Sequence, residues 1–294
     1  MPTRGTPPAI RRYPAASAFL AAATPFLVER EAEHNLIFGI ASNVRREEAM
    51  GRAVLPPPYL ATAERDGRIV GAAIMTPPRH AVLSCLDDPQ AVAAFVDDLG
   101  RFDPPTPGVS ATPEVARDFA DAWCSPRALN PRRTFAERIY RLERVLAPTG
   151  VPGATRVATL ADRDLLLAWS RAFLADGLGR TGDDEARQLV DRALDLGQRT
   201  FYLWEVDGRP VSMAALGGET PNGLRVGPVY TPRDLRGRGY ASAVTAAASQ
   251  AALDEGRRFV FLFTDLANPT SNKIYQAIGY EPVIDIDMLH FDPA

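Results

Sequence analysis

Hydrophobic and polar positions alternate in two stretches of the chain that share one design. Residues 59–73 read as a strand, a tight turn and a second strand, and residues 202–215 repeat that order. Both stretches carry Asp-Gly-Arg at the turn, and Asp-Gly between alternating apolar positions is typical of a two-residue β-hairpin. The repeat predicts that the chain contains two copies of one fold.

The elements after each hairpin come in matching order. In the first half, apolar runs and helical spacing predict strand, helix, strand, helix and strand at residues 81–86, 91–99, 109–111, 113–124 and 139–145. In the second half, the same signals predict the same order at residues 224–230, 241–255, 259–264, 268–279 and 282–291. The segment Ala147–Gly153, which has two prolines and two glycines, is the predicted linker.

The segment Arg236–Ala241 lies between an apolar strand and an alanine-rich helix. Its residues Gly237 and Gly239 let a ligand approach the backbone closely, because they lack a Cβ. A strand, a glycine turn and a helix start point several N–H groups at one spot, which suits a phosphate. The order of residues differs from a Rossmann fingerprint and from a P-loop, and a turn that binds nothing has the same local features.

A second ordered segment follows the apolar strand Phe259–Phe263. Asn268 is a favourable helix N-cap, Pro269 suits the first helical position, and Gly279 is a typical helix stop. The segment therefore predicts a short helix, with Tyr275 near its end.

Together these two segments resemble the GNAT superfamily of acyl-CoA N-acyltransferases. The signature [Q/R]-x-x-G-x-[G/A] of that family is matched by Arg236, Gly239 and Ala241. Its later signature is an asparagine, a tyrosine, and then a glycine with an aromatic residue. The matching residues are Asn268, Tyr275, Gly279 and Tyr280. The resemblance covers residues 154–294, and two ordered motifs are far more specific than either alone.

The resemblance implies an α/β (α+β) fold of two tandem GNAT-like domains. Each domain would be a mixed, mostly antiparallel sheet flanked by helices. We expect a degenerate GNAT-like domain at residues 11–147 and a GNAT acetyltransferase domain at residues 154–294. The last strand, near Pro282–Phe291, is expected to pair with or exchange into a neighbouring domain or subunit, because an edge strand offers free hydrogen-bonding groups.

The resemblance also implies a coenzyme A site in the second copy, with acetyl-CoA as co-substrate and an amine, small-molecule or peptide, as acceptor. The pyrophosphate would lie on the N–H groups of residues 237–242, and the pantetheine would run beside the preceding strand. The cofactor-binding residues expected are Val229, Tyr230, Thr231, Arg236, Gly237, Arg238, Gly239, Tyr240, Ala241, Ser242 and Asn268. Tyr275 would be the acid that protonates the departing thiolate. For the base we favour Glu219, with Asp265, Glu205 or a water chain as alternatives.

The first copy lacks these features. In place of the glycine turn it has Asp87-Asp88-Pro89-Gln90-Ala91, and two carboxylates would repel a pyrophosphate. Its counterpart of the short helix carries Phe119 and Trp123 where the second copy has a tyrosine. We expect this copy to be structural or to form a wall of the acceptor site.

Composition narrows the function classes further. The net charge of −3 and the isoelectric point near 5.7 give no reason to expect binding to nucleic acid or to a membrane surface. Two cysteines without C-x-x-C spacing argue against a disulfide scaffold or a zinc site, and the three histidines lack metal spacing. No metal is therefore expected, and the protein would be a monomer or homodimer.

The N-terminal stretch and the acceptor leave alternatives open. Arg11-Arg12 before an apolar run is similar to a secretory signal, but the sequence favours two helices, the second capped by Thr24 with Pro25 at its first position, and a cytoplasmic protein. Residues 24–58 would line the acceptor site or form a solvated face; they include Glu31, Glu33, His34 and Asn35. Two other classes remain open, a non-catalytic acyl-CoA sensor and a structural or partner-binding module.

Overall fold

In the computed structural model, residues 7–179 and 183–294 are described, and the chain divides into two compact units. The first unit holds residues up to Ile139, together with Asp265–Ala267 and Val283–Ala294. The second unit holds Tyr140–Thr264 and Asn268–Pro282. No helix of the described residues is long and apolar enough to cross a membrane.

The sheet of the first unit has the strand order β1-β2-β3-β4-β5-β12-β6. Its strands are β1 (Ala9–Arg12), β2 (Tyr59–Arg65), β3 (Arg68–Met75), β4 (Ala81–Leu83), β5 (Gly108–Ala111), β6 (Leu129–Leu142) and β12 (Glu281–Pro293). The pair β4–β5 is parallel, whereas β1–β2, β2–β3, β3–β4 and β5–β12 are antiparallel.

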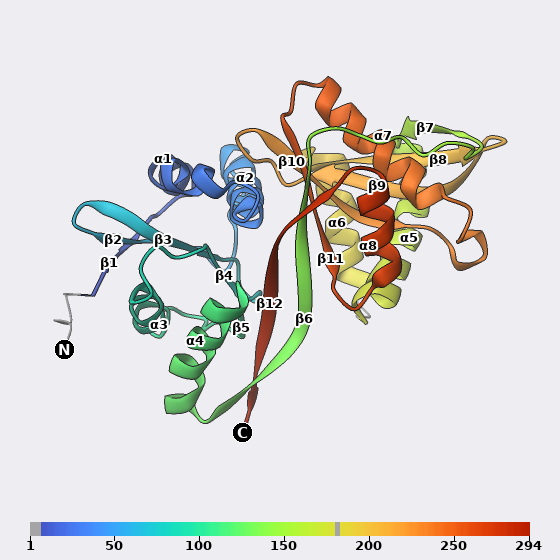
Figure 1. Ribbon diagram of the computed structural model, residues 1–294. Coiled ribbons are helices and arrows are strands. Elements are labelled where there is room, and N and C mark those ends of the chain that lie inside the picture. Colours follow the sequence, from blue (N-terminus) through green and yellow to red (C-terminus); the bar gives the residue numbers. More distant parts are fainter. Residues whose placement is uncertain (1–6, 180–182) are drawn as a thin grey trace. The chain divides into compact units, whose positions relative to one another are not determined.

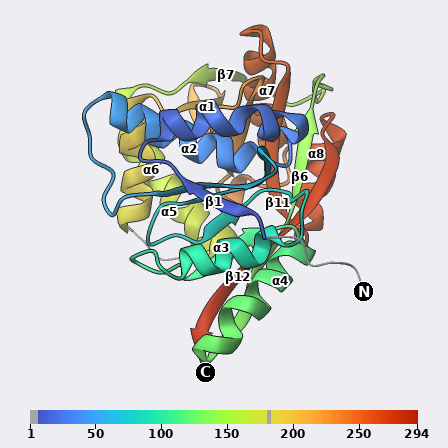
Figure 2. The same ribbon diagram turned by 90° about the vertical axis from the view of Figure 1, so that its left-hand side faces the viewer.

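Helices cover both faces of this sheet (Figures 1 and 2). They are α1 (Ala16–Leu27), α2 (Asn35–Ala49), α3 (Ala91–Leu99) and α4 (Pro113–Cys124), with short 3-10 turns η1 (Val28–Arg30) and η2 (Ser125–Arg127). Helices α1 and α2 pack on Leu60, Ala72 and Ile74, while α3 and α4 pack on residues of the opposite face, such as Ala61 and Ala73. Successive strand residues thus point into different cores, as the two-residue period requires.

The second unit repeats this plan. Its sheet has the order β11-β10-β9-β8-β7, formed by β7 (Ala154–Val157), β8 (Arg199–Val206), β9 (Arg209–Gly217), β10 (Gly223–Tyr230) and β11 (Phe259–Asp265). Only β10–β11 is parallel among the pairs β7–β8, β8–β9, β9–β10 and β10–β11. Its helices are α5 (Arg163–Leu178), α6 (Asp183–Leu196), α7 (Tyr240–Asp254) and α8 (Pro269–Ala277), with 3-10 turns η3 (Leu160–Asp162) and η4 (Arg233–Leu235).

The alternating face rule holds here as well. Leu203 and Met213 pack under α5 and α6, whereas Tyr202 and Ala214 pack under α7 and α8. The mixed, mostly antiparallel α/β fold expected from the sequence is confirmed in both units.

The two hairpins share their turn and their irregularity. Both residues of each Asp-Gly turn have positive φ, +50° and +74° at Asp66-Gly67 and +50° and +71° at Asp207-Gly208. Two successive positive φ values define a type I′ turn, as the sequence predicts. Each first strand also has a register shift three residues before the turn, at Ala63/Glu64 in β2 and Trp204/Glu205 in β8. The shared bulge strengthens the repeat.

Two sequence predictions need correction. Thr24 does not begin a second helix, because α1 continues through Pro25 and ends at Leu27, with Val28 N–H donating to the Thr24 carbonyl. Pro25 has no N–H to donate to the Ala21 carbonyl, so α1 lacks that one helical bond. The strand expected at residues 139–145 is β6, which begins at Leu129. The arginine and glutamate residues interleaved in it predict an edge strand, but β6 has a neighbour on each side. The Thr134 hydroxyl donates to the Met288 carbonyl, and the Leu266 N–H donates to the Ala136 carbonyl.

The last strand, β12, pairs with a strand from the first half of the sequence, as expected. Asp287 to His290 of β12 pair antiparallel with Ala111 to Gly108 of β5. Residues 283–294 therefore belong to the first compact unit, although the predicted second domain ran to residue 294. The compact units are defined by which residues pack together, whereas the domain boundaries expected from the sequence are defined by the repeat.

Candidate functional site

The glycine turn joins the end of β10 to the start of α7. Gly237 and Gly239 have φ of +78° and +81°, in the region that side chains with a Cβ rarely adopt. Gly239 is the N-cap of α7 and offers no side chain to its N–H groups, and no acidic residue lies in the first turn. The helix start is therefore open to an external anion.

The backbone N–H groups of residues 237–242 are the main feature of this turn. The first bond of the helix runs from Ala243 N–H to the Gly239 carbonyl, at 3.0 Å. Within residues 7–179 and 183–294, none of the preceding N–H groups from 237 to 242 has a protein acceptor. Helix-start N–H groups without partners, together with the helix dipole, favour a phosphate group.

Strand β10 separates from β11 beside this turn. Its parallel pairing with β11 covers only Gly223 to Arg225, whereas its pairing with β9 continues to Tyr230, with a register shift between Val226 and Val229. Among the described residues, Val229 and Tyr230 thus have a strand neighbour only on the β9 side. An extended amide-containing ligand can use the other side, as the resemblance implies for pantetheine.

Helix α8 places Tyr275 in the same core as Val229. Both side chains are partly buried and pack on the apolar cluster beneath α7. The Tyr275 ring meets the edge of Tyr280 at 6.1 Å, and the Tyr280 hydroxyl lies 2.8 Å from Ser249 on α7. This chain of contacts fixes the orientation of Tyr275.

Burial raises the pKa of Tyr275 to about 12. The phenol therefore stays protonated at neutral pH and is available as a hydrogen-bond donor. It also releases its proton less readily than an ordinary tyrosine, so full transfer to a thiolate is more uphill than the sequence alone suggests.

Asn268 acts locally as the helix cap. Its Oδ1 accepts from the Ser271 N–H at 3.0 Å, and its carbonyl accepts from Asn272 Nδ2 at 2.7 Å. Asn272 in turn accepts from the Tyr140 hydroxyl at 2.9 Å. These bonds confirm the predicted cap and hold the start of α8.

The two arginines of the turn differ in their surroundings. The Arg236 guanidinium donates to Asp176 on α5 at 2.7 Å and to the Thr231 carbonyl at 3.0 Å. Arg238 is exposed and makes one long contact, 3.4 Å to the Asp234 carbonyl. Arg236 is thus engaged by the protein, while the Arg238 side chain is exposed beside the turn.

Thr231, Tyr230 and Tyr240 are also held by neighbours. The Thr231 hydroxyl lies 2.8 Å from Ser212, the Tyr230 ring lies 6.2 Å from Trp169, and Tyr240 is buried. Ala241 and Ser242 are partly exposed in the first turn of α7. These side chains shape the site, whereas the backbone offers its donors.

The geometry gives no support to Glu219 as the base. Glu219 makes a 2.9 Å ion pair with Arg257, past the C-terminal end of α7. It precedes β10, whereas the glycine turn follows β10, and a strand of eight residues separates its ends by roughly 25 Å. The sequence shows the carboxylate but not this partner.

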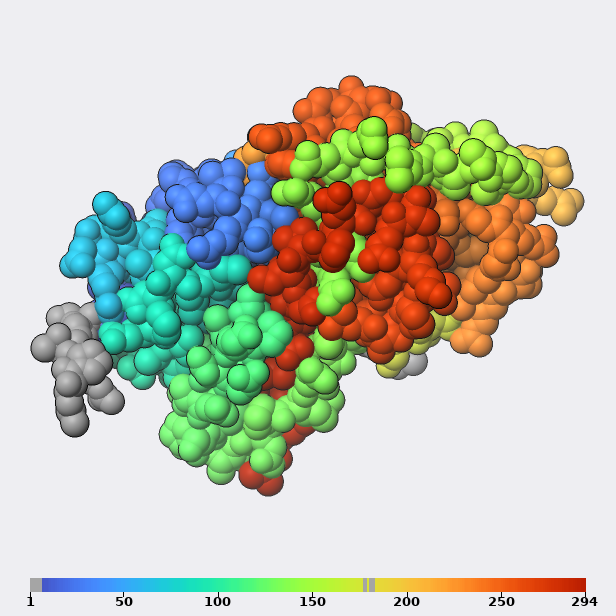
Figure 3. All heavy atoms as spheres, in the orientation of Figure 1, coloured from blue at the N-terminus to red at the C-terminus, as the bar shows by residue number. Residues whose placement is uncertain are grey.

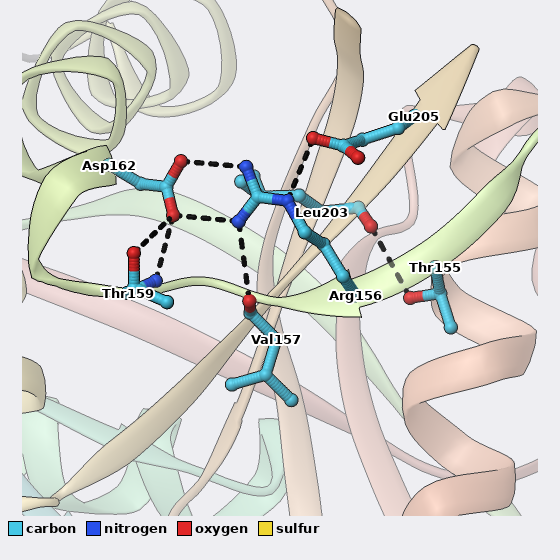
Figure 4. Close-up of polar contacts among 7 residues, drawn as sticks. All are labelled: Thr155, Arg156, Val157, Thr159, Asp162, Leu203 and Glu205. Atoms are coloured by element: carbon cyan, nitrogen blue, oxygen red, sulfur yellow. Dashed lines mark hydrogen bonds and ion pairs between the residues drawn. The ribbon is translucent and has the colours of Figure 1, made fainter. Parts of the chain in front are cut away.

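The other two candidate bases are also engaged. Glu205 on β8 accepts from Arg156 at 2.7 Å, and Arg156 makes two further bonds to Asp162 (Figure 4). Asp265 accepts from the Ala267 N–H at 2.8 Å. Glu205 is thus bonded to β7, and Asp265 to the loop after β11.

The linker forms an unexpected part of this region. Leu146 N–H bonds the Ile278 carbonyl after α8, and the Trp204 indole donates to the Pro152 carbonyl. Between them, a Val151 methyl lies 2.8 Å from where a Cβ on Gly239 would stand. In Figure 3 the light-green linker and β7 run along the surface beside red α8. Gly239 therefore accommodates Val151 as well as a helix start.

The first unit fills its corresponding position with its own side chains. An Asp88 oxygen accepts from the Gln90 N–H at 2.9 Å, next to the start of α3, and its other oxygen pairs with Arg65 at 2.8 Å. Asp87 pairs with Arg30 at 2.9 Å. An internal carboxylate thus occupies the place that an external anion would need.

His34 and Asn35, which we considered for the acceptor site, lie inside the first unit. His34 Nε2 accepts from the Cys85 N–H at 3.1 Å, so its Nδ1 carries the proton and donates to the Leu27 carbonyl at 2.9 Å. Asn35 is fully buried and donates to the Ala32 carbonyl. These two residues have structural roles.

The remaining candidate groups are metal ligands and cysteine thiols. No group of three or more His, Cys, Asp or Glu that could hold a metal ion occurs there. Cys85 and Cys124 are free thiols, and burial raises the pKa of both.

Comparisons with known proteins bear on the second unit first. Residues 164–280 match the sequence profile of the Acetyltransferase (GNAT) family. A comparison with curated proteins finds no match. The matched segment contains the glycine turn, Asn268 and Tyr275.

Solved structures resemble the chain over most of its length. A Drosophila protein is similar over 97% of this chain and 99% of its own, with a TM-score of 0.71 and 12% identity. A tandem GNAT protein from the clavulanic acid biosynthesis pathway is similar over 96% of this chain and 98% of its own, with a TM-score of 0.56 and 14% identity. A GCN5-related N-acetyltransferase from Kribbella flavida is similar over 76% of this chain and 87% of its own, with a TM-score of 0.53 and 18% identity.

At these identities the structural likeness shows a shared fold, and the sequence profile shows the family. Residues 164–280 therefore form a domain of the acetyltransferase (GNAT) family, and the chain has the fold of tandem GNAT proteins.

Proposed function

We propose that the second unit transfers the acetyl group of acetyl-CoA to a primary amine by direct attack. The observation that carries this proposal is the row of N–H groups at residues 237–242 without protein acceptors, beside the point where β10 leaves β11. The diphosphate of coenzyme A would bind these N–H groups, and pantetheine would follow Val229 to Thr231.

The proposed reaction needs few protein groups. The amine nitrogen bonds the thioester carbon, and a backbone N–H of β10 stabilises the oxyanion that develops. The C–S bond then breaks, and the thiolate takes a proton from Tyr275 or shares its hydrogen bond. The proton of the amine leaves to water, which also returns a proton to Tyr275; Glu219 and Glu205 pair with Arg257 and Arg156.

The first unit would have a supporting role. Asp88 and Asp87 present negative charge at the position of the glycine turn, and Asp88 already bonds the backbone there. We therefore propose one coenzyme A site per chain, and a structural first unit.

Titration calorimetry with acetyl-CoA tests the proposal. The wild type is expected to bind close to one equivalent, and Gly239→Trp is expected to abolish binding, because its side chain would meet Val151 and fill the turn. Gly208→Trp is the matched control: Gly208 has the same kind of φ, +71°, and lies in an exposed hairpin with nothing within 4 Å. Equal affinity in Gly239→Trp and Gly208→Trp would contradict the site.

A screen of amines, with release of free thiol as readout, then tests catalysis. Thiol release that depends on both acetyl-CoA and an amine supports the transferase. Tight binding without turnover on any amine would point to an acyl-CoA sensor, and no binding would point to a structural or partner-binding module.

A further inference from the structure

One carboxylate on α5 holds the connection between β10 and α7. Asp176 accepts two bonds from Arg233 in η4, at 2.5 and 3.2 Å, and one from Arg236 at 2.7 Å. Arg236 also donates to the Thr231 carbonyl, at 3.0 Å. The acidic side chain thus joins both ends of the segment that leads into Gly237.

We call the bonds of Asp176 to Arg233 and Arg236 the Asp176 clamp. It lies next to a backbone segment whose ordering costs much conformational entropy. Gly237 and Gly239 both hold positive φ, and glycine loses more conformational freedom on ordering than any other residue. Arg233, Arg236, Arg238 and the two glycines are exposed, so burial does little to fix them. The arginine–carboxylate bonds offset part of that loss.

In this arrangement the signature arginine, Arg236, bonds to the protein itself and does not point its guanidinium at a ligand. Arg236 bonds a carboxylate and a carbonyl through different nitrogens, a pattern that needs the planar guanidinium. Asp176 stays ionised, since hydrogen bonds from Arg233 and Arg236 hold its pKa at about 2. The charge of Asp176 is directed at arginines and away from the N–H groups of the turn.

We propose that Asp176 is a positioning residue: through Arg233 and Arg236 it holds residues 237–242 in the conformation that binds the diphosphate of coenzyme A. This inference rests on the proposed function. It assigns a binding role to a helix that carries no part of the family signature.

The direction of the effect separates positioning from simple electrostatics. Removing a negative charge near an anion site strengthens anion binding through space. Removing a clamp weakens binding, because the apparent affinity falls with the fraction of molecules whose turn is in the competent conformation. A fall of that fraction to a tenth weakens binding about tenfold.

The experiment measures acetyl-CoA affinity by calorimetry for wild type, Asp176→Asn and Asp191→Asn. Asp191 on α6 is the matched control, because it also forms an ion pair with an arginine. Its partner is Arg163 on α5, at 2.7 Å, and lies outside the turn. We expect about tenfold weaker binding for Asp176→Asn and no change for Asp191→Asn.

A combined variant tests whether Asp176 acts through Arg233 and Arg236. Asp176→Asn added to Arg233→Ala with Arg236→Ala is expected to bind no more weakly than the two arginine changes alone, because both sets of changes remove the same bonds. Independent, multiplying losses would overturn the inference.

The outcomes distinguish this inference from the proposed function. Wild-type binding with unchanged or tighter binding by Asp176→Asn overturns the positioning role and leaves the site standing. Equal weakening by Asp176→Asn and Asp191→Asn also overturns it, since the effect would be general. No binding by the wild type overturns both.

Discussion

Burial sets the proton affinity of two side chains with different tasks, Tyr275 in the second unit and His34 in the first. Burial raises the pKa of Tyr275 to about 12 and lowers the pKa of His34, because it disfavours the charged form of each. Tyr275 thus stays a neutral phenol, and His34 stays a neutral imidazole with a fixed tautomer. Each residue supports a prediction of its own.

Tyr275→Phe removes the proposed hydrogen-bond donor and keeps the ring contact with Tyr280. We expect turnover to fall roughly 100-fold, at the lower end for a lost general acid, and acetyl-CoA affinity to stay unchanged. Steady-state kinetics and calorimetry measure the two quantities. Tyr202→Phe, in the same apolar cluster, is the control that should change neither. Full activity in Tyr275→Phe would exclude the acid role.

The second residue-scale prediction is a loss of stability in mild acid. The folded pKa of His34 is below the value of about 6.5 expected in the unfolded chain, so protons bind preferentially to the unfolded state as the pH falls. Its contribution is complete above pH 6.5 and decreases below it, by up to about 1.4 kcal/mol per pH unit. Urea unfolding at pH 8 and pH 5 measures the loss, and His34→Gln should reduce the difference between the two pH values. An equal difference in that variant would contradict it.

At the scale of elements, short strands and helices are joined by arginine–carboxylate bonds. Arg156 on β7 links Glu205 on β8 to Asp162, which closes a capping box with Thr159 before α5 (Figure 4). Asp176 on α5 links the segment before α7. In both places an element with little apolar surface is located by a charged hydrogen-bond network.

Arg156→Ala is expected to destabilise the second unit by about 1–2 kcal/mol, a value reduced for the partial exposure of the arginine. Arg156 hydrogen bonds hold the pKa of Asp162 at about 2, so this stability is present above the unfolded value near 3.9 and is lost as the pH falls toward 2. Denaturant unfolding of wild type and variant at pH 7 and pH 2 measures it. Arg163→Ala, which removes a single exposed pair, should cost less. A difference that persists at pH 2 would be contrary to this account.

At the scale of the whole chain, the two ends of the sequence build one unit. Strand β12 pairs with β5, and Phe291 stacks 6.2 Å from Phe119 and 6.3 Å from Trp123. The first unit therefore cannot complete its core until the last residues of the chain are present.

Phe291→Ala is expected to destabilise the first unit by about 3–5 kcal/mol, the usual cost of emptying a buried phenylalanine site. Unfolding followed by tryptophan fluorescence measures the loss. Met288→Ala, on the same strand but outside the apolar cluster, should cost less. Equal costs for the two variants would show that the C-terminal strand does not complete this core.

The sequence by itself determined the features that depend on neighbouring residues. The Asp-Gly turns, the Asn268 cap, the Gly279 stop and the glycine turn before α7 all formed as predicted. Each is fixed by backbone angles or hydrogen bonds within a few residues, so local chemistry is sufficient. The repeat and the family followed from these local features in order.

Only the tertiary structure decided the partners that are distant in sequence. Strand β6 begins at Leu129 among arginines and a proline because β12 lies beside it, and no local apolar pattern marks its first half. Glu219 is drawn to Arg257, and Arg236 to Asp176, across 38 and 60 residues. Such pairs depend on which elements the apolar cores bring together, and a charged residue read in sequence carries no record of that choice.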